Sequence, residues 1–382
     1  MRTLVFGGSF DPPHRGHAAL LRAAAERVLP DRILVVPAFH APLKDAPSAP
    51  APVRAELARL GLIARLPARW GRRARVDMSE TRARRPVYAV ETLARLKALD
   101  PAGKFHFVCG RDAAASFPRW KEPARLRRLA TWWYGARASR AGAKTPPPPR
   151  HFRRLPGRFP DISSTELRSA LALGQDCSDA VYPEVLAEAR RHGLYSLDIL
   201  DSLRKTLKPA RYEHTLAMAA LAEALARRHG EDPAKALLAG LLHDAGRRFS
   251  PPLMAEYARR RRLKVPEFAL TAGLEPLLLH AHISEDLARR EFGVADPEVL
   301  SAVRKHTLGD PQMSRLDRLV YVADACSPDR ERADAAETRA LAFVDLDAAL
   351  ARCVADKLAH ALSRGAWLHP LTLSLWNRLV AR

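Results

Sequence analysis

The sequence predicts two domains of different class: an α/β domain with a doubly wound parallel sheet, followed by an all-helical domain. In the first half, short apolar runs such as Leu4–Phe6 and Ile33–Val36 alternate with helical patterns, as βαβ units require. After Tyr195 the strand-like runs disappear, and helical patterns rich in Ala, Leu and Arg take over. We therefore predict one domain over residues 1–196 and a second over residues 200–382.

The composition is that of a globular protein with a large excess of positive charge. Of the 382 residues, 47% are hydrophobic and 27% are charged, and the formal net charge is +21. This charge favours nucleotides and polyphosphates as ligands, whereas nucleic-acid binding is not expected because the sequence has no basic stripe with interleaved aromatics. No apolar run approaches the roughly 20 residues that span a bilayer, and no signal peptide is expected. Four well-separated cysteines without a CxxC pair favour reduced thiols and a cytoplasmic location.

A glycine turn between the first predicted strand and the first predicted helix marks the first candidate site. The apolar strand Met1–Phe6 is joined to a helix over Ala18–Val28 by the sequence Gly7-Gly8-Ser9-Phe10-Asp11-Pro12-Pro13-His14-Arg15-Gly16-His17. Free N–H groups and the helix dipole at such a junction favour phosphate binding. We expect Gly7 and Gly8 to take positive φ angles and Gly16 to leave room for a ligand. His14 and His17 should share one face if the helix begins near His14.

This motif resembles the (T/H)xGH signature of the nucleotidylyltransferase superfamily, which has a Rossmann-like fold, and the longer string resembles the nicotinate-mononucleotide adenylyltransferase family. The resemblance implies that His14 and His17 contact the α- and β-phosphates of ATP. It also implies that the binding site includes the preceding residues Gly7, Gly8, Ser9 and Phe10. The segment Pro37–Lys44 resembles the family's next loop, which implies that Lys44 faces the phosphates.

The remaining elements of the first domain follow in order from periodicity and turn residues. Strands are expected at Arg32–Pro37, Arg75–Asp77, Lys104–Cys109 and Leu129–Gly135. Helices are expected at Val53–Leu66 and Tyr88–Leu99, and the stretch Tyr182–Tyr195 resembles the closing helix of the nucleotidylyltransferase fold. Ser79–Arg85 is predicted to be a polar loop, and the proline- and arginine-rich segment Ala136–Pro160 an exposed loop without a regular element.

The segment Pro86–Leu93 resembles the part of the family that surrounds the pyridine ring. By this resemblance, Thr81 and Tyr88 face the nicotinate pocket. Ala89 replaces the usual hydroxyl residue and Glu91 the usual aspartate, so the resemblance leaves the selectivity for the pyridine ring open.

Gly110 and Asp112 come directly after a predicted strand, where ligands bind in open parallel sheets. The resemblance implies that the carboxylate of Asp112 accepts a hydrogen bond from a ribose hydroxyl. Trp120 lies in a segment similar to the family's phe-x-x-trp-lys stretch, so its ring either stacks on the pyridine or is a buried structural side chain.

A third motif begins at Ile162, where serine and threonine precede a predicted helix. Hydroxyl residues followed by Glu166 are by themselves a helix-capping signal. In combination with the first motif, the stretch resembles the superfamily's ISSTxxR motif. The resemblance implies that the β- and γ-phosphates of ATP are held by Ser163, Ser164, Thr165 and Arg168.

Histidines and aspartates within apolar helical patterns mark the second candidate site. Helices are expected at Tyr212–Arg228, Pro233–Ala245, Pro297–His306 and Leu316–Ala325. Burying carboxylates and imidazoles there is costly unless they bind a metal or each other. Nitrogen and oxygen ligands suit iron, manganese, cobalt or nickel. We predict a metal centre with the ligands His214, His243, Asp244, His280, His306 and Asp324.

This ordered set resembles the HD superfamily of metal phosphohydrolases, and its flanking strings resemble the subgroup that splits diadenosine tetraphosphate into two ADP molecules. The resemblance implies two transition-metal ions, iron or else manganese or cobalt, with Asp244 as a bridging ligand. It also implies that Arg247 and Arg330 bind phosphate. Arg247 stands where the subgroup usually has lysine, and Glu285 where it usually has a small residue.

Together these motifs predict a bifunctional enzyme. The first domain would transfer AMP from Mg²⁺-bound ATP to nicotinate mononucleotide by in-line displacement, and the second would hydrolyse diadenosine tetraphosphate. The first domain could instead use another mononucleotide or pantetheine phosphate. The second could be a different nucleotide phosphohydrolase or a regulatory nucleotide-binding module. The sequence leaves open whether the chain forms a homo-oligomer.

Overall fold

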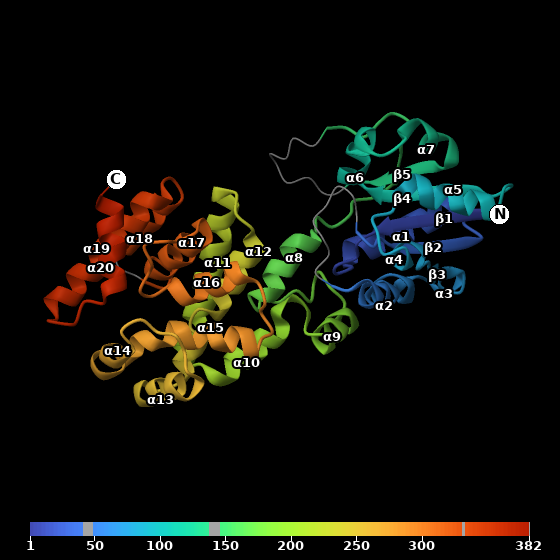
Figure 1. Ribbon diagram of the computed structural model, residues 1–382. Coiled ribbons are helices and arrows are strands. Elements are labelled where there is room, and N and C mark those ends of the chain that lie inside the picture. Colours follow the sequence, from blue (N-terminus) through green and yellow to red (C-terminus); the bar gives the residue numbers. More distant parts are fainter. Residues whose placement is uncertain (41–48, 137–145, 331–332, 382) are drawn as a thin grey trace. The chain divides into compact units, whose positions relative to one another are not determined.

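The computed structural model describes residues 1–40, 49–136, 146–330 and 333–381, which form two compact units (Figure 1). The first unit comprises Met1–Leu171 and Gln175–Leu197, and the second comprises Ala172–Gly174 and Asp198–Arg382. Among the described residues, no helix combines the length and the apolar character needed to cross a membrane.

The first unit is built on a six-stranded sheet with the order β3-β2-β1-β4-β5-β6, in which every neighbouring pair is parallel. The strand order reverses direction between β1 and β4, so the carboxyl ends of these two strands form the edge where ligands bind in such sheets. The strands are β1 (Arg2–Gly8), β2 (Arg32–Pro37), β3 (Ala74–Val76), β4 (Lys104–Gly110), β5 (Thr131–Gly135) and β6 (Arg153–Arg154).

Helices cover both faces of this sheet because the strand side chains alternate between two apolar clusters. Leu4 and Phe6 pack with residues of α1 and α2, whereas Val5 packs with residues of α5, α6 and α7. The helices of this unit are α1 (Arg15–Val28), α2 (Ala51–Gly61), α3 (Ala68–Gly71), α4 (Ser79–Arg82), α5 (Ala89–Leu99), α6 (Arg111–Ala115), α7 (Pro123–Leu129), α8 (Ser164–Ala172) and α9 (Pro183–Arg191), with 3₁₀ turns at Ile63–Arg65, Phe117–Arg119 and Leu194–Ser196.

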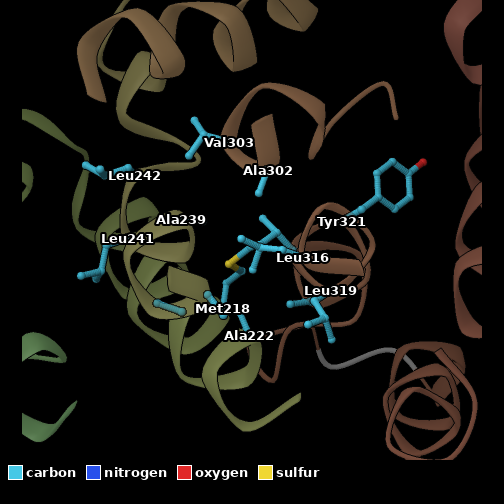
Figure 2. Packing of buried hydrophobic residues seen from close by; sticks show 14 of the residues in the cluster. Met218, Ala222, Ala239, Leu241, Leu242, Ala302, Val303, Leu316, Leu319 and Tyr321 are labelled. Atoms are coloured by element: carbon cyan, nitrogen blue, oxygen red, sulfur yellow. The ribbon is translucent and has the colours of Figure 1, made fainter. Parts of the chain in front are cut away.

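The second unit consists of helices, and Figure 2 shows how their apolar side chains interlock at its centre. Met218 and Ala222 of α11 contact the same cluster as Leu316 and Leu319 of α17. The helices are α10 (Leu197–Thr206), α11 (Pro209–His229), α12 (Pro233–Leu242), α13 (Pro251–Arg261), α14 (Phe268–Leu274), α15 (His280–Arg290), α16 (Pro297–Lys305), α17 (Arg315–Ala325), α18 (Ala333–Ala342), α19 (Leu346–Ser363) and α20 (Pro370–Val380), with 3₁₀ turns at Ala245–Arg248 and Pro276–Leu279.

The predicted fold class, a doubly wound α/β unit followed by a helical unit, is confirmed. Three local predictions were wrong. The polar loop after β3 contains the one-turn helix α4, and the predicted irregular loop contains β6, whose neighbour Leu155 is fully buried. The helix predicted to extend to Ala245 ends at Leu242, so the His243-Asp244 pair follows the helix. These short features depend on tertiary contacts, which sequence periodicity does not reveal.

Candidate functional site

The loop after β1 brings the two histidines of the first motif together at the start of α1. His14 is the N-cap residue, and its Nδ1 accepts a hydrogen bond from the backbone N–H of His17 at 3.3 Å. Nδ1 of His17 accepts from the backbone N–H of His14 at 3.4 Å, and the two rings stack with centroids 3.6 Å apart. The shared face predicted for the two imidazoles is therefore observed, and the helix begins at Arg15.

The predicted role of the glycines in this loop was wrong. Gly7 and Gly8 belong to β1, and the left-handed conformation falls on Phe10, with φ of 52°. A Cβ atom on Gly8 would lie 2.9 Å from the Phe10 ring, and one on Gly16 would lie 3.0 Å from Nδ1 of His14. These glycines therefore make room for the protein's own side chains, and in particular Gly16 accommodates the His14 imidazole.

The third motif packs directly against the first, although more than 150 residues separate them. Ser164 Oγ donates to the carbonyl of Pro12 at 2.9 Å. Arg168 Nη1 donates to the carbonyl of Asp11 at 2.8 Å, and Nη2 donates to Thr165 Oγ1 at 3.3 Å. The start of α8, which includes Ser163 as the residue before the helix, thus lies beside the histidine loop. A guanidinium and hydroxyl groups, which are suitable phosphate ligands, therefore lie beside the loop that carries the two histidines.

Two residues that the sequence analysis did not single out, Arg54 and Tyr195, hold this loop in place. Arg54 is 1% exposed and donates to three carbonyls: Ala49 at 2.9 Å, Ser9 at 2.8 Å and Phe39 at 3.0 Å. Burial lowers its pKa, and the nearby Asp11 opposes this shift. The buried Asp11 carboxylate accepts from the hydroxyl of Tyr195 at 2.8 Å. An arginine within a helical pattern gives no sequence signal for such a role, because surface arginines have the same spacing.

Lys44 falls within residues 41–48 and lies outside the described residues. Its role as a phosphate-facing lysine stays a prediction. Phe39 and Ala49, whose carbonyls Arg54 binds, flank this segment on its two sides.

Of the residues predicted to bind the ribose and the pyridine ring, Asp112 is exposed whereas Trp120 is half-buried. Gly110 ends β4, beside β1, and a Cβ atom there would meet nothing within 4 Å, so the space above the strand is open. Asp112 is exposed in the first turn of α6. Trp120 is half-buried, donates from Nε1 to Ser116 Oγ at 3.0 Å and lies 5.5 Å from the Phe117 ring, so it belongs partly to an aromatic cluster.

A buried carboxyl group lies next to the predicted nicotinate pocket. Glu80 is 9% exposed, and desolvation raises its pKa to about 7, although the hydroxyl of Thr92 donates to it at 2.6 Å. Thr81 is buried and donates to the carbonyl of Met78 at 2.8 Å. Tyr88 is half-buried, with the ammonium of Lys121 4.6 Å above its ring.

In the second unit, the predicted metal ligands come from five helical segments, and three of the imidazoles lie near the Asp244 carboxylate. Nε2 of His243 lies 3.5 Å from its carboxylate, Nε2 of His280 3.2 Å and Nε2 of His306 3.9 Å. On the other side of His243, Nε2 of His214 lies 3.2 Å from Asp324 Oδ1. Two groups have ligand atoms close enough to hold an ion: His214, His243 and Asp244, and Asp244, His280 and His306. Asp244 belongs to both.

The histidine rings are oriented by the backbone. Nδ1 of His243 is 2.7 Å from the carbonyl of Gly240, Nδ1 of His306 is 2.7 Å from that of Val303, and Nδ1 of His280 bonds the carbonyl of Leu277. A ring that donates from Nδ1 presents the lone pair of Nε2, which is the form that binds a metal. Nε2 of His243 is buried without a hydrogen-bond partner among the described residues, and a bound cation would be a suitable partner for its lone pair. The residues present therefore fit a metal centre.

The electrostatics of the centre favour the charged forms of Asp244 and Asp324 and the neutral forms of His243 and His306. Burial opposes the charge on Asp244, yet His243, His280 and His306 hold its pKa well below the usual range. Burial likewise lowers the pKa of His243 and of His306, so both rings remain neutral at pH 7. Burial alone would lower the pKa of His214, but the carboxylates of Asp324 and Asp329 outweigh this effect and raise the pKa.

Further side chains surround the centre, and the sequence analysis missed two of them. Asp329 Oδ2 lies 2.8 Å from Nδ1 of His214 and orients that ring, and Arg211 Nη1 donates to Asp244 Oδ2 at 2.9 Å. Of the two predicted phosphate ligands, Arg330 donates to Asp324 Oδ1 at 2.9 Å, whereas Arg247 is half-buried, with a pKa that burial lowers against the pull of Asp244. Three guanidinium groups thus surround the carboxylates.

Comparison with known families and proteins agrees with both sites. Residues 5–170 match the cytidylyltransferase-like family, and residues 211–329 match the HD domain family. The chain is 36% identical over 196 residues to a probable nicotinate-nucleotide adenylyltransferase of Albidiferax ferrireducens, which covers 50% of this chain and 96% of that protein. It is 33% identical over 184 residues to a symmetrical bis(5'-nucleosyl)-tetraphosphatase of Bacillus subtilis, which covers 48% of this chain and 97% of that protein.

A third relative has both halves in one chain. It is a probable nicotinate-nucleotide adenylyltransferase/Ap4A hydrolase of Mycoplasma genitalium, 23% identical over 331 residues, which cover 87% of this chain and 89% of that protein. The order of the two halves is the same as the order of the two sites here. The chain therefore belongs to the nicotinate-nucleotide adenylyltransferase family over its first half and to the symmetrical bis(5'-nucleosyl)-tetraphosphatase family over its second half.

Proposed function

We propose that this chain is a bifunctional enzyme of nucleotide metabolism. The first unit transfers AMP from ATP to nicotinate mononucleotide, giving nicotinate adenine dinucleotide and pyrophosphate, and the second hydrolyses diadenosine tetraphosphate to two ADP molecules. The observation that carries the proposal is the convergence of each predicted residue set. His14 and His17 stack beside the loop that Arg168 contacts, and the six proposed metal ligands cluster, with Asp244 in both possible ion groups and Asp324 beside His214.

Adenylyl transfer requires positioning and charge stabilisation, without a covalent enzyme intermediate. We assign His14 and His17 to the α- and β-phosphates of ATP, since their rings stack at the helix N-terminus. Arg168, with Ser163, Ser164 and Thr165, binds the leaving pyrophosphate, and Lys44 assists. Asp112 and Gly110 bind a ribose, whereas Thr81, Tyr88 and Trp120 surround the pyridine. Mg²⁺ bound with ATP would offset the negative charge of the phosphates.

In the second unit, His214, His243, Asp244, His280, His306 and Asp324 would hold two divalent ions, for which we propose iron, manganese or cobalt. When bound, such ions supply a nucleophilic hydroxide at neutral pH and stabilise the departing phosphate oxygen. The protein's own groups orient the substrate. Arg247 and Arg330 bind its phosphates, and Arg211 is a third cation at the same carboxylates.

The two activities can be separated by one substitution in each unit. We expect His17→Ala to reduce formation of nicotinate adenine dinucleotide by orders of magnitude while diadenosine tetraphosphate hydrolysis is retained. Asp244→Ala should have the opposite effect, because that carboxylate belongs to both possible ion groups. Each variant is thus the folding control for the other, with products resolved by chromatography after incubation with Mg²⁺ or with Mn²⁺, Co²⁺ or Fe²⁺.

The products of the hydrolysis distinguish the possible reactions. ADP as the sole product supports symmetric cleavage, whereas ATP plus AMP would contradict it. A His17→Ala enzyme with full transferase activity would refute the first assignment. We also propose a cytoplasmic location, which the four buried free thiols support.

A further inference from the structure

The second unit contains a cavity of about 460 Å³ that neither proposed reaction uses. It is lined by the segment that follows α13, by one face of α15, by the end of α16 and by the loop after it. None of the six proposed metal ligands lines it. His280 and His282 lie two residues apart on α15, about 200° around the helix axis. The first therefore faces the metal centre while the second faces the cavity.

The cavity has more positive than negative charge in its lining. Arg262 and Lys264 are exposed, and neither has a hydrogen-bond or ion-pair partner for its side chain within the described part of the chain. Arg304 and Arg289 share the carboxylate of Glu285, at 3.1 and 3.5 Å. The other charged lining residues are already paired: Lys305 with Asp317, Asp286 with Arg290 and Arg261, and Asp310 with the backbone N–H of Gln312. The side chains of Arg262 and Lys264 are therefore available to bind an anion in the cavity.

A buried imidazole in the same lining also lacks a partner. His282 is 6% exposed, and its Nδ1 is buried without a hydrogen bond. Buried polar side-chain atoms in folded proteins nearly always have a partner, so Nδ1 of His282 is available to hydrogen-bond a ligand in the cavity. Apolar lining comes from Leu263, Leu308 and Leu371.

We propose that this cavity binds a phosphorylated small molecule. Phosphoryl oxygens are strong acceptors that suit arginine and lysine, and Arg262, Lys264 and Arg304 surround the space they would occupy. His282 would hydrogen-bond the same ligand, and the leucines would contact its organic part. The volume lies in the range of ordinary small-molecule pockets. Because α15 carries both cavity residues and the proposed ligand His280, and His306 directly follows α16, the bound anion would lie one helix away from the metal centre.

Anion binding to the full-length protein tests this proposal. Equilibrium dialysis with pyrophosphate, with ADP and with citrate is carried out in excess chelator, so that no anion binds through a metal ion. Lys264→Ala and His282→Leu are compared with wild type, and Arg260→Ala is the matched control. Arg260 is an exposed arginine on α13 that does not line the cavity.

We expect wild type and Arg260→Ala to bind pyrophosphate or ADP at one class of sites. In Lys264→Ala and in His282→Leu, binding at these sites should be absent or at least tenfold weaker. Sites in the first unit remain in all four proteins. ADP tighter than pyrophosphate identifies a nucleotide, and equal affinities identify a free polyphosphate; both support the proposal. His282→Leu should melt no lower than wild type, because it removes an unpartnered buried polar group. Binding that is unchanged in both variants, or citrate that binds as tightly as pyrophosphate, would overturn it.

Discussion

Replacing Arg54 by methionine tests whether one buried guanidinium organises the adenylyl-transfer site. The side chain is 1% exposed and donates to the carbonyls of Ser9, Phe39 and Ala49. Methionine keeps much of the apolar stem but leaves those carbonyls without a donor. A buried carbonyl without its donor costs about 1–3 kcal/mol. Since two of the three bonds are only part-buried, water can replace some of the loss.

We therefore expect Arg54→Met to lower the free energy of unfolding of the first unit by about 3 kcal/mol. The carbonyl of Ser9 belongs to the histidine loop, and those of Phe39 and Ala49 flank the segment with Lys44. A small displacement of these groups should reduce kcat/KM for adenylyl transfer by about tenfold or more. Arg54→Lys keeps the charge but not the planar fork, so its effects should be intermediate.

Urea unfolding followed by tryptophan fluorescence measures this loss, because the first unit contains most of the tryptophans: Trp70, Trp120, Trp132 and Trp133. Arg59→Met is the matched control on the same helix, since Arg59 is exposed and forms its ion pair with Glu56 on the protein surface. We expect its effect to be below about 1 kcal/mol. The reasoning is refuted if Arg54→Met matches Arg59→Met in both stability and kcat/KM.

Three further predictions concern protons, packing and metal. Burial raises the pKa of Glu80 to about 7, so between pH 4.5 and pH 7 the folded protein keeps a proton on this carboxyl group that the unfolded chain releases. The free energy of unfolding should therefore fall by about 3 kcal/mol as the pH rises from 4.5 to 7. Urea titrations of Glu80→Gln should not show this pH dependence. Gly246→Ala places a Cβ atom 2.6 Å from the carbonyl of His280, so it should destabilise the second unit by about 1–3 kcal/mol in thermal melts, whereas Gly273→Ala, where a Cβ atom meets nothing within 4 Å, should not. Mn²⁺ at a hundred times its Kd should stabilise the second unit by about 2.7 kcal/mol in calorimetry, and Asp244→Ala should abolish this shift; an equal shift in that variant contradicts the ligand assignment.

Hydrophobic periodicity was sufficient to predict the regular elements that form the frame of each site. The strand Arg32–Pro37 has the bounds that were predicted, because an unbroken apolar run between prolines has no other stable place than a buried strand. The clustering of histidines and aspartates in the second unit could also be predicted, because imidazoles and carboxylates in apolar helical patterns are costly to bury unless they bind a metal or each other. In both cases the information is local, in the residue types and their spacing.

The contacts that support these sites could not be predicted in the same way. Arg54, Arg211 and Asp329 are charged residues in helical or polar segments, where surface residues are the rule. Their roles depend on which carbonyl or carboxylate reaches them from a distant part of the chain. The positive φ of Phe10 was missed for a related reason, since the adjacent glycines are the usual residues for that conformation.

Both sites use backbone carbonyls to fix their functional groups. Arg54 donates to the carbonyl of Ser9 in the histidine loop, and His243 and His306 donate from Nδ1 to carbonyls within their own helical turns. A hydrogen bond to a backbone carbonyl fixes a functional group relative to the main chain. Replacing a neighbouring side chain therefore leaves this hydrogen bond intact. A backbone shift, by contrast, moves the carbonyl and the functional atom together. The packing of Gly246 against the carbonyl of His280 should therefore matter for metal affinity as much as for stability, although Gly246 contributes no ligand atom.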